Sequence, residues 1–305
     1  MKKSYENLAD AFGQCFGLAK FVCHGKIPVD IADELNLKMH RRIMRYPCIG
    51  ALEYFGDYYA CYEHSYKQKH LDEEISDEQI RAKAVTYLGE VFKRDTDKIA
   101  AAFFPDGEIG RSLVFIPENI EDSNALRADE ASGHLAKGTG TIAGVLDHEL
   151  GHALHNHFGR IALDACEKAK TICANCTYPK SCEMLRLAYD EYEKRKDAGS
   201  IRVDLSAYAI SNLGEFFAEC FAEYKNHKAV NGGLGPRLLA KTVGKQIDLA
   251  NVEFTKSEFT ETLEVKLGFS LDRIERYIMA LEVLDFDKLD GQTLSMNSII
   301  SGLGE

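Results

Sequence analysis

The chain has 305 residues, of which 45% are hydrophobic and 28% are charged, as in an ordinary globular protein. That composition argues against a disordered chain and against a fibrous repeat. Asp and Glu number 48 against 37 Lys and Arg, and the net charge of −11 argues against broad electrostatic binding of nucleic acid or of an anionic membrane. We therefore expect no nucleic acid and no membrane among its partners.

Cysteine usage and the N-terminus favour a cytoplasmic protein. Nine cysteines cannot all pair within one chain, so a reducing compartment is the simpler interpretation. Acidic and polar residues follow directly after Lys2 and Lys3, where a signal peptide would have an apolar segment. The densest apolar runs, such as Ile99 to Phe104, fall far short of the ~18 residues of a transmembrane helix.

In chain order, residues 1–90 are predicted to form helices, because apolar residues recur at spacings of three and four, as at Ile31, Leu35 and Met39. The best strand candidate follows, a short apolar and β-branched stretch before Pro117. It comprises Ser112, Leu113, Val114, Phe115 and Ile116.

The second half of the chain is predicted to be mainly helical. A helix starts near Thr141, a plausible N-cap, and a charged helix covers residues 183–197. Another helix begins near Asn212, and the sequence NGGLGP at 231–236 is typical of a linker or turn. A last helix is predicted around residues 271–284.

The helix that starts near Thr141 carries the most informative residues, since His148-Glu149-Leu150-Gly151-His152 is the H-E-x-x-H pattern of zinc peptidases. Histidines four residues apart lie ~40° apart around a helix and ~6 Å apart along it, so both can bind one metal. Glu149 lies ~100° from His148 and can reach a water on that metal without being a ligand.

A catalytic zinc normally takes three protein ligands, so a third is needed. A metzincin would have Gly in place of His155 and His in place of Phe158, which excludes that class. His155 shares a helix face with His148 but lies two turns away, too far to bind the same ion. We expect it to support the site, to face the substrate or to be solvated.

A second helix supplies the better candidates, Glu215 and Glu219, which are again four residues apart on an amphipathic segment. A solvated acidic face is the alternative interpretation. Because a chain with H-E-x-x-H needs a carboxylate or histidine from another helix, the metal-site interpretation gains weight here.

Tyr208, followed seven residues later by Glu215 in the sequence EFFAE, resembles the second half of the active site of lethal-factor-type gluzincins. It also resembles the related metallopeptidase-like domains of phage minor head proteins. The resemblance covers roughly residues 110–224.

The resemblance implies one catalytic zinc and a role for each residue of the motifs. The implied ligands are His148, His152 and Glu215. Glu149 is the implied general base, Tyr208 the implied stabiliser of the transition state, and Glu219 the implied partner of a ligand histidine.

The resemblance also implies the fold class: α+β and predominantly helical, with a zincin-like core made of a small sheet and two active-site helices, plus helical additions. The predicted domains are then a helical N-terminal region (1–90), a zincin-like catalytic domain (91–230) with a Cys-rich insertion at 160–185, and a helical or mixed C-terminal region (231–305).

The predicted function is that of a zinc-dependent metallopeptidase acting on a peptide or protein substrate. We expect an extended peptide to bind along the strand Ser112 to Ile116 by main-chain pairing. One alternative is a phage or prophage particle component that uses the zincin fold for assembly, with phage structural proteins as partners and incorporation into a virion. A weaker alternative is a toxin or effector protease.

A second metal site is predicted in a short loop that contains Cys166, Cys173, Cys176 and Cys182. Four thiolates suit a closed tetrahedral zinc site that would order this insertion. Two disulfides, an iron–sulfur cluster and free thiols are the alternatives.

Overall fold

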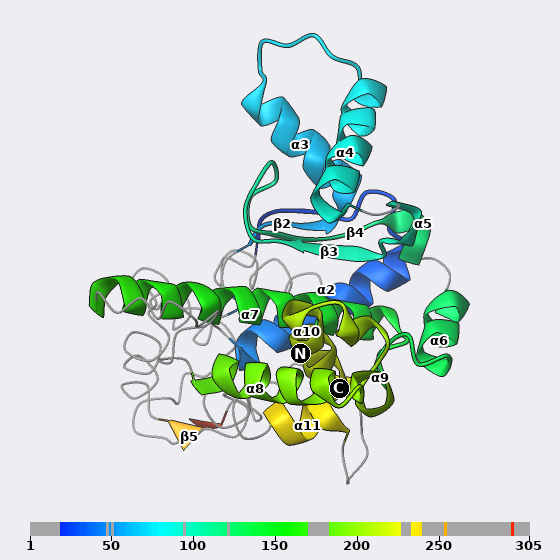
Figure 1. The fold of residues 1–305 in the computed structure, drawn as a ribbon. Helices are drawn as coiled ribbons and strands as arrows, with labels where there is room; N and C mark the ends of the chain where they lie inside the picture. Colours follow the sequence, from blue (N-terminus) through cyan, green and yellow to red (C-terminus); the bar gives the residue numbers. More distant parts are fainter. Residues whose placement is uncertain are drawn as a thin grey trace.

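The protein is described by a computed structural model, whose described residues are 19–46, 49, 52–93, 96–120, 123–169, 183–226, 233–239, 253–254 and 294–295. This part of the chain is mostly helical and contains a small four-stranded mixed sheet (Figure 1). The predicted predominance of helices and the predicted small sheet are confirmed, and the arrangement is compatible with the α+β class.

The sheet has the order β1-β2-β4-β3. It consists of β1 (Ala19–Cys23), β2 (Leu52–Asp57), β3 (Ala101–Phe104) and β4 (Ser112–Phe115). β2 pairs parallel with β1 on one side and with β4 on the other, and β3 pairs antiparallel with β4 at one edge of the sheet. A separate two-stranded ladder joins β5 (Glu253–Phe254) to β6 (Leu294–Ser295).

Helices flank both faces of the sheet (Figure 1). The longer ones are α2 (Val29–Arg45), α3 (Tyr58–Lys69), α4 (Asp77–Phe92), α6 (Ser123–Ala131), α7 (Ile142–Ala169), α8 (Glu183–Asp197) and α10 (Leu213–Asn226). The short ones are η2 (Thr96–Lys98), α5 (Pro117–Ile120), α9 (Ile201–Asp204), η3 (Tyr208–Ile210) and α11 (Leu234–Leu239).

Strand alternation divides the core into two clusters, one on each face of the sheet. Phe55, Leu113 and Phe103 pack with α2, α7 and α10, whereas Tyr54 and Val114 pack with α3 and α4 on the opposite face. The α3–α4 pair covers that second face and projects away from it (Figure 1). The helices that carry the predicted metal ligands and general base, α7 and α10, lie on the first face.

Four predicted helices are confirmed, two of them by their caps. Thr141 caps α7, since its hydroxyl accepts a hydrogen bond from the N–H of Gly144 at 3.0 Å. Asn212 caps α10 in the same way through the N–H of Glu215, also at 3.0 Å. The helix predicted at 183–197 is α8, and the one around Ile31, Leu35 and Met39 is α2.

The prediction that residues 1–90 form a separate helical region is wrong. Strands β1 and β2 fall in this range, and β2 pairs with β4 across the predicted boundary. The predicted linker at 231–236 is corrected as well, because residues 234–239 form α11 and bury Leu234 and Leu239 in the core. The predicted central domain therefore shares its sheet and core with its neighbours.

The substrate-strand prediction is also wrong. The stretch Ser112 to Ile116 does form a strand, β4, as far as Phe115, but β4 lies between β2 and β3. Its main-chain groups are used on both sides, so it has no edge to offer a peptide. The edge strand on this side of the sheet is β3.

A buried ionic cluster joins α7 to α2 and α10. Asp147 is fully buried and accepts hydrogen bonds from Arg42 Nε at 2.6 Å and Nη2 at 2.9 Å. Lys38 Nζ and Asn226 Nδ2 each lie 2.8 Å from the same carboxylate. Burial raises the pKa of Asp147, but the charge and hydrogen bonds of Arg42 and Lys38 outweigh this and lower it.

Two sequence predictions lie outside the described residues. These are the helix around residues 271–284 and the four-cysteine site, for which Cys173, Cys176 and Cys182 are not described and Cys166 is described only as part of the α7 backbone. Within the described part of the chain, no helix combines the length and apolarity needed to span a bilayer.

Candidate metal centre

The site lies where α7 crosses α10. Gly151 permits this crossing, because a Cβ atom at this position would lie only 2.7 Å from Ala218 Cα of α10. The close approach brings one turn of α7, which carries His148 and His152, against the first turn of α10, which carries Glu215. The glycine inside the H-E-x-x-H pattern is thus required by packing.

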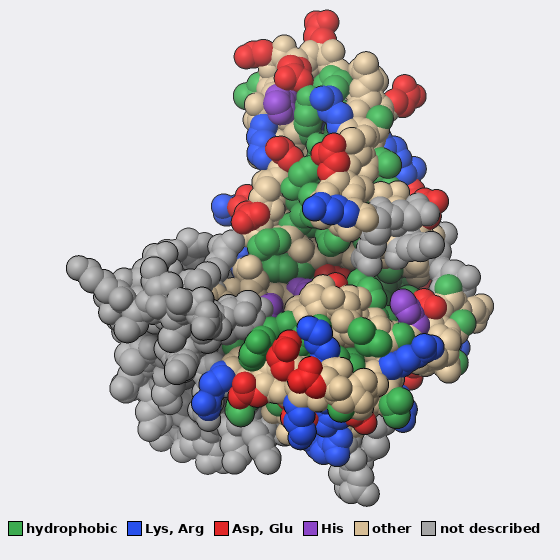
Figure 2. All heavy atoms as spheres, in the orientation of Figure 1, with side chains coloured by type: hydrophobic (Ala, Val, Ile, Leu, Met, Phe, Trp, Pro, Cys, Tyr) green, Lys and Arg blue, Asp and Glu red, His purple; other side chains and the backbone are tan. Residues whose placement is uncertain are grey.

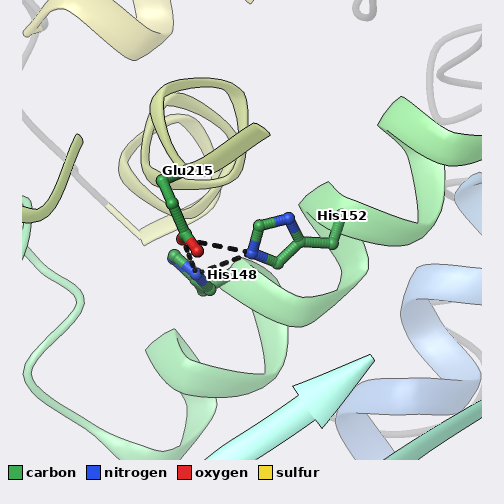
Figure 3. Close-up of side chains that lie close together, drawn as sticks. All are labelled: His148, His152 and Glu215. Carbon is green, nitrogen blue, oxygen red and sulfur yellow. Dashed lines mark hydrogen bonds and ion pairs between the residues drawn. The ribbon is translucent and has the colours of Figure 1, made fainter. Parts of the chain in front are cut away.

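Three side chains converge at this crossing (Figure 3). The Nε2 atoms of His148 and His152 lie 3.1 Å apart. Glu215 Oε2 lies 3.1 Å from His148 Nε2 and 3.2 Å from His152 Nε2. The three predicted ligands therefore form one group that could hold a metal ion.

The spacing of these atoms fits a tetrahedral ion. Zinc–nitrogen and zinc–oxygen bonds of ~2.0–2.1 Å imply a separation of about 3.3 Å between ligand atoms at the corners of a tetrahedron. The observed separations of 3.1 to 3.2 Å are close to this value without any movement of the side chains. Two imidazoles and one carboxylate are also a donor set that catalytic zinc uses.

Glu219 contacts the Nδ1 side of His148, the partnership that the resemblance implied. This carboxylate is fully buried, with Oε1 at 2.8 Å from His148 Nδ1 and Oε2 accepting a hydrogen bond from the N–H of Ala136 at 2.6 Å. Such a carboxylate orients a ligand imidazole so that Nε2 faces the metal. Burial lowers the pKa of His148, but hydrogen bonds with Glu215 and Glu219 outweigh burial and raise it well above its ordinary value.

The charge around the site is negative. Among the described residues, no Lys or Arg forms an ion pair with Glu149, Glu215 or Glu219. Burial raises the pKa of Glu215, but hydrogen bonds from His148 and His152 outweigh burial and keep its carboxylate ionised. Carboxylates balanced only by histidines and backbone N–H groups favour a bound cation.

The carboxylate of Glu149, the predicted general base, is anchored by the backbone of the edge strand. It is buried beside the three converging side chains, and its Oε2 accepts a hydrogen bond from the N–H of Phe103 at 2.8 Å. In the β3–β4 ladder Ala102 and Phe104 alternate with Phe103, whose N–H points away from β4 and is free to bind Glu149. Phe103 therefore positions Glu149 through its main chain.

We predict that an ester bond at Phe103, introduced with phenyllactic acid, lowers the rate of peptide cleavage about tenfold, because Glu149 loses a charge-assisted hydrogen bond. Zinc content should not change. The same replacement at Phe104, whose N–H faces β4, should mainly lower the unfolding free energy, and its smaller effect on cleavage would come from the weaker acceptor at the Phe103 C=O. If the Phe103 ester cleaves peptide at the wild-type rate, the Phe103 N–H does not position Glu149 for catalysis.

Tyr208 lies beside the converging histidines. Its ring centroid is 5.6 Å from that of His148 and 5.5 Å from that of His134. Two backbone hydrogen bonds hold this segment, from Tyr208 N to His134 O at 3.1 Å and from Ala207 N to Gly133 O at 2.8 Å. The structure thus brings the predicted transition-state residue to the same site as the ligands.

Two cavities flank the site, and Figure 2 shows histidine side chains in the hollow between the sheet and the lower helices. One cavity is lined by Ala101, Leu126, Val145, His148 and Tyr208, among others. The other is lined by Phe103, His152, His155 and Glu215, among others. Burial lowers the pKa of His155 to about 4, with a smaller effect of His152, so His155 is a neutral wall of the second cavity.

Sequence reasoning missed the backbone donors Phe103 N–H and Ala136 N–H and the edge position of β3. A usable signal for β3 was present. The apolar run from Ile99 to Phe104 is followed by Pro105-Asp106-Gly107, a turn sequence that leads back into β4.

No protein-family model, no curated protein and no solved structure matches this chain. The geometry of the site must therefore carry the functional conclusion.

Proposed function

We propose that the protein is a zinc-dependent metallopeptidase of the gluzincin type, with a zincin-like core formed by the sheet, α7 and α10. The observation that supports this most strongly is the set of three ligand atoms 3.1 to 3.2 Å apart, with one carboxylate beside them and another behind His148. His148, His152 and Glu215 would hold the zinc, which when bound polarises a carbonyl and acidifies a water molecule.

Each remaining residue of the site has a task in peptide hydrolysis. Glu149 accepts a proton from the attacking water and delivers it to the leaving amine. The phenolic hydroxyl of Tyr208 donates a hydrogen bond to the oxyanion that develops on the scissile carbonyl. Glu219 keeps the Nδ1 side of His148 occupied, so its Nε2 remains directed at the ligand position.

The substrate in this proposal is a peptide in an extended conformation on β3. Ala101 and Phe103 turn their main-chain groups away from β4, as the hydrogen bond from Phe103 N–H to Glu149 indicates. The N–H of Phe103 is taken by Glu149, whereas its C=O and both main-chain groups of Ala101 have no partner among the described residues and can pair with the peptide. A peptide that pairs with these groups adds a strand to the edge of the sheet beside β3.

The particle-assembly role and the effector role stay predictions from the sequence resemblance. Both are compatible with a zinc site, and normal particle formation by a Glu149→Gln variant would favour the assembly role over proteolysis. A metallopeptidase is the function that uses the whole arrangement of ligands, base and cavities.

Metal analysis of purified wild type, His148→Ala and Cys173→Ala tests the metal part of the proposal. If both predicted sites bind zinc, wild type contains two equivalents and each variant one, since removing one of three or four ligands abolishes tight binding. If only the α7–α10 site binds zinc, the one equivalent of wild type is lost in His148→Ala alone. Unchanged zinc in His148→Ala would overturn the proposed function.

A further inference from the structure

The cavity lined by Leu126 and Val145 has a wall that is partly apolar and partly polar. Leu126 of α6, Leu135, and Val145 of α7 form the apolar part, and the buried His148 and Glu149 line the cavity together with Tyr208. A side chain that enters this cavity therefore comes from a residue next to the scissile bond. Its stem would contact hydrocarbon.

One carboxylate in the wall of this cavity has no partner among the residues that the structure describes. Asp129, an exposed residue of α6, lines the cavity, and its side chain forms no hydrogen bond or ion pair with any described residue. Its backbone carbonyl accepts hydrogen bonds from the N–H groups of His134 and Leu135 and from the hydroxyl of Ser132. The neighbouring Glu130, by contrast, is occupied by the N–H groups of Gly138 and Gly140.

The lining residues of this cavity include no Lys or Arg. Its acidic groups are Asp129, which is exposed, and Glu149 and Glu219, which are buried near His148; the exposed His134 lines it as well. An apolar stretch of wall beside a carboxylate that no described residue pairs matches a side chain with a hydrocarbon stem and a positively charged head.

On the basis of the proposed function, we infer that Asp129 determines specificity and that the protein cleaves peptides with Lys or Arg in this cavity. The direction of the peptide on β3 decides which of its residues enters this cavity. We take antiparallel pairing, the slightly more stable arrangement. The chain enters β3 from Ala100, which lines this cavity and not the other, and runs through Ala101, which lines both, to Phe103, which lines only the other. An antiparallel peptide then places the residue that follows the scissile bond against Asp129.

The first experiment uses the zinc-loaded full-length protein and a mixture of random peptides, with cleavage sites read by mass spectrometry. Lys and Arg should be enriched directly after the cleaved bond. A pair of peptides that differ only in lysine or norleucine at that position then isolates the charge, because the two side chains share the same stem. We expect a roughly threefold to fivefold higher kcat/KM for lysine at low ionic strength, and a smaller ratio in high salt.

Variants of Asp129 identify the residue responsible. Asp129→Asn should bring the lysine-to-norleucine ratio to about one, Asp129→Glu should preserve it, and Asp129→Lys should favour a glutamate peptide. Asp72→Asn is the matched control, since Asp72 is exposed between α3 and α4, outside the cavity, and its loss changes the net charge equally. Peptide affinities measured on the Glu149→Gln variant should show the same ratio without cleavage.

The outcomes separate this inference from the proposed function. Cleavage without a basic preference, or a preference that Asp129→Asn leaves intact, would overturn the inference while the metallopeptidase proposal stands. Enrichment of Lys and Arg before the cleaved bond would overturn the assigned position. A zinc-loaded protein that neither cleaves nor binds any peptide would overturn the proposed function and this inference with it.

Discussion

Replacing Glu149 by Gln should lower the rate of peptide cleavage by roughly 10²- to 10⁴-fold, the usual contribution of a general base. Glutamine keeps the shape of the side chain, and its amide oxygen can still accept the hydrogen bond from Phe103 N–H. What disappears is the capacity to take a proton from water. Since Glu149 is not one of the three proposed ligands, zinc content should stay at the wild-type level.

The measurement is a time course of labelled casein digestion by zinc-loaded wild type and Glu149→Gln. Glu74→Gln is the matched control, because Glu74 is exposed between α3 and α4 and lines neither cavity. Zinc content and melting temperature measured on the same samples separate lost chemistry from lost structure. A Glu149→Gln variant with wild-type activity would remove Glu149 from the mechanism.

The α7 half of the site could be predicted from the sequence because it is local. Two histidines one turn apart converge on any helix, and Thr141 marks where this helix begins. Glu215 and Glu219 repeat that spacing on α10. Which helix α10 would meet is a tertiary property, and it depends on a glycine, Gly151, that the motif leaves unspecified.

The sheet was harder to predict because its pattern is not local. β3 is buried along its whole length, so its sequence shows a continuous apolar run and no alternation. In β2, Gly56 has a φ of +125°, and a Cβ atom there would lie 2.0 Å from the carbonyl oxygen of Cys23. A glycine that is typical of a turn thus lies within a parallel strand, because β1 passes too close for a side chain.

The backbone donors of the site have no sequence signal of their own. Phe103 N–H is available to Glu149 because β3 is an edge strand and Phe103 faces away from β4. Whether β3 is an edge strand and which way its N–H groups face both depend on how the strands pair, and this pairing is long-range in the sequence. A motif can therefore predict metal ligands and a general base, whereas the group that positions the base requires the fold.

Replacing Asp147 by Asn should lower the free energy of unfolding by about 3–5 kcal/mol, the largest stability effect we predict at a single position. Asparagine is nearly isosteric, so packing is kept, but Arg42 and Lys38 lose their counter-ion in a site that water hardly reaches. Urea unfolding of samples treated with a chelator measures this effect without a contribution from bound metal.

An exposed ion pair provides the comparison for Asp147→Asn. Glu118 lies 2.5 Å from Arg81 with both side chains exposed, so Glu118→Gln should cost less than about 1 kcal/mol. Combining Asp147→Asn with Arg42→Gln should recover part of the lost unfolding free energy, because the double variant no longer buries an Arg42 charge without its carboxylate. Equal costs at Asp147 and Glu118 would contradict the prediction. A large cost at Asp147 alone would mean that this residue, directly before His148, holds α7 against α2 and α10. The same contacts would then also keep both zinc-binding histidines oriented toward Glu215.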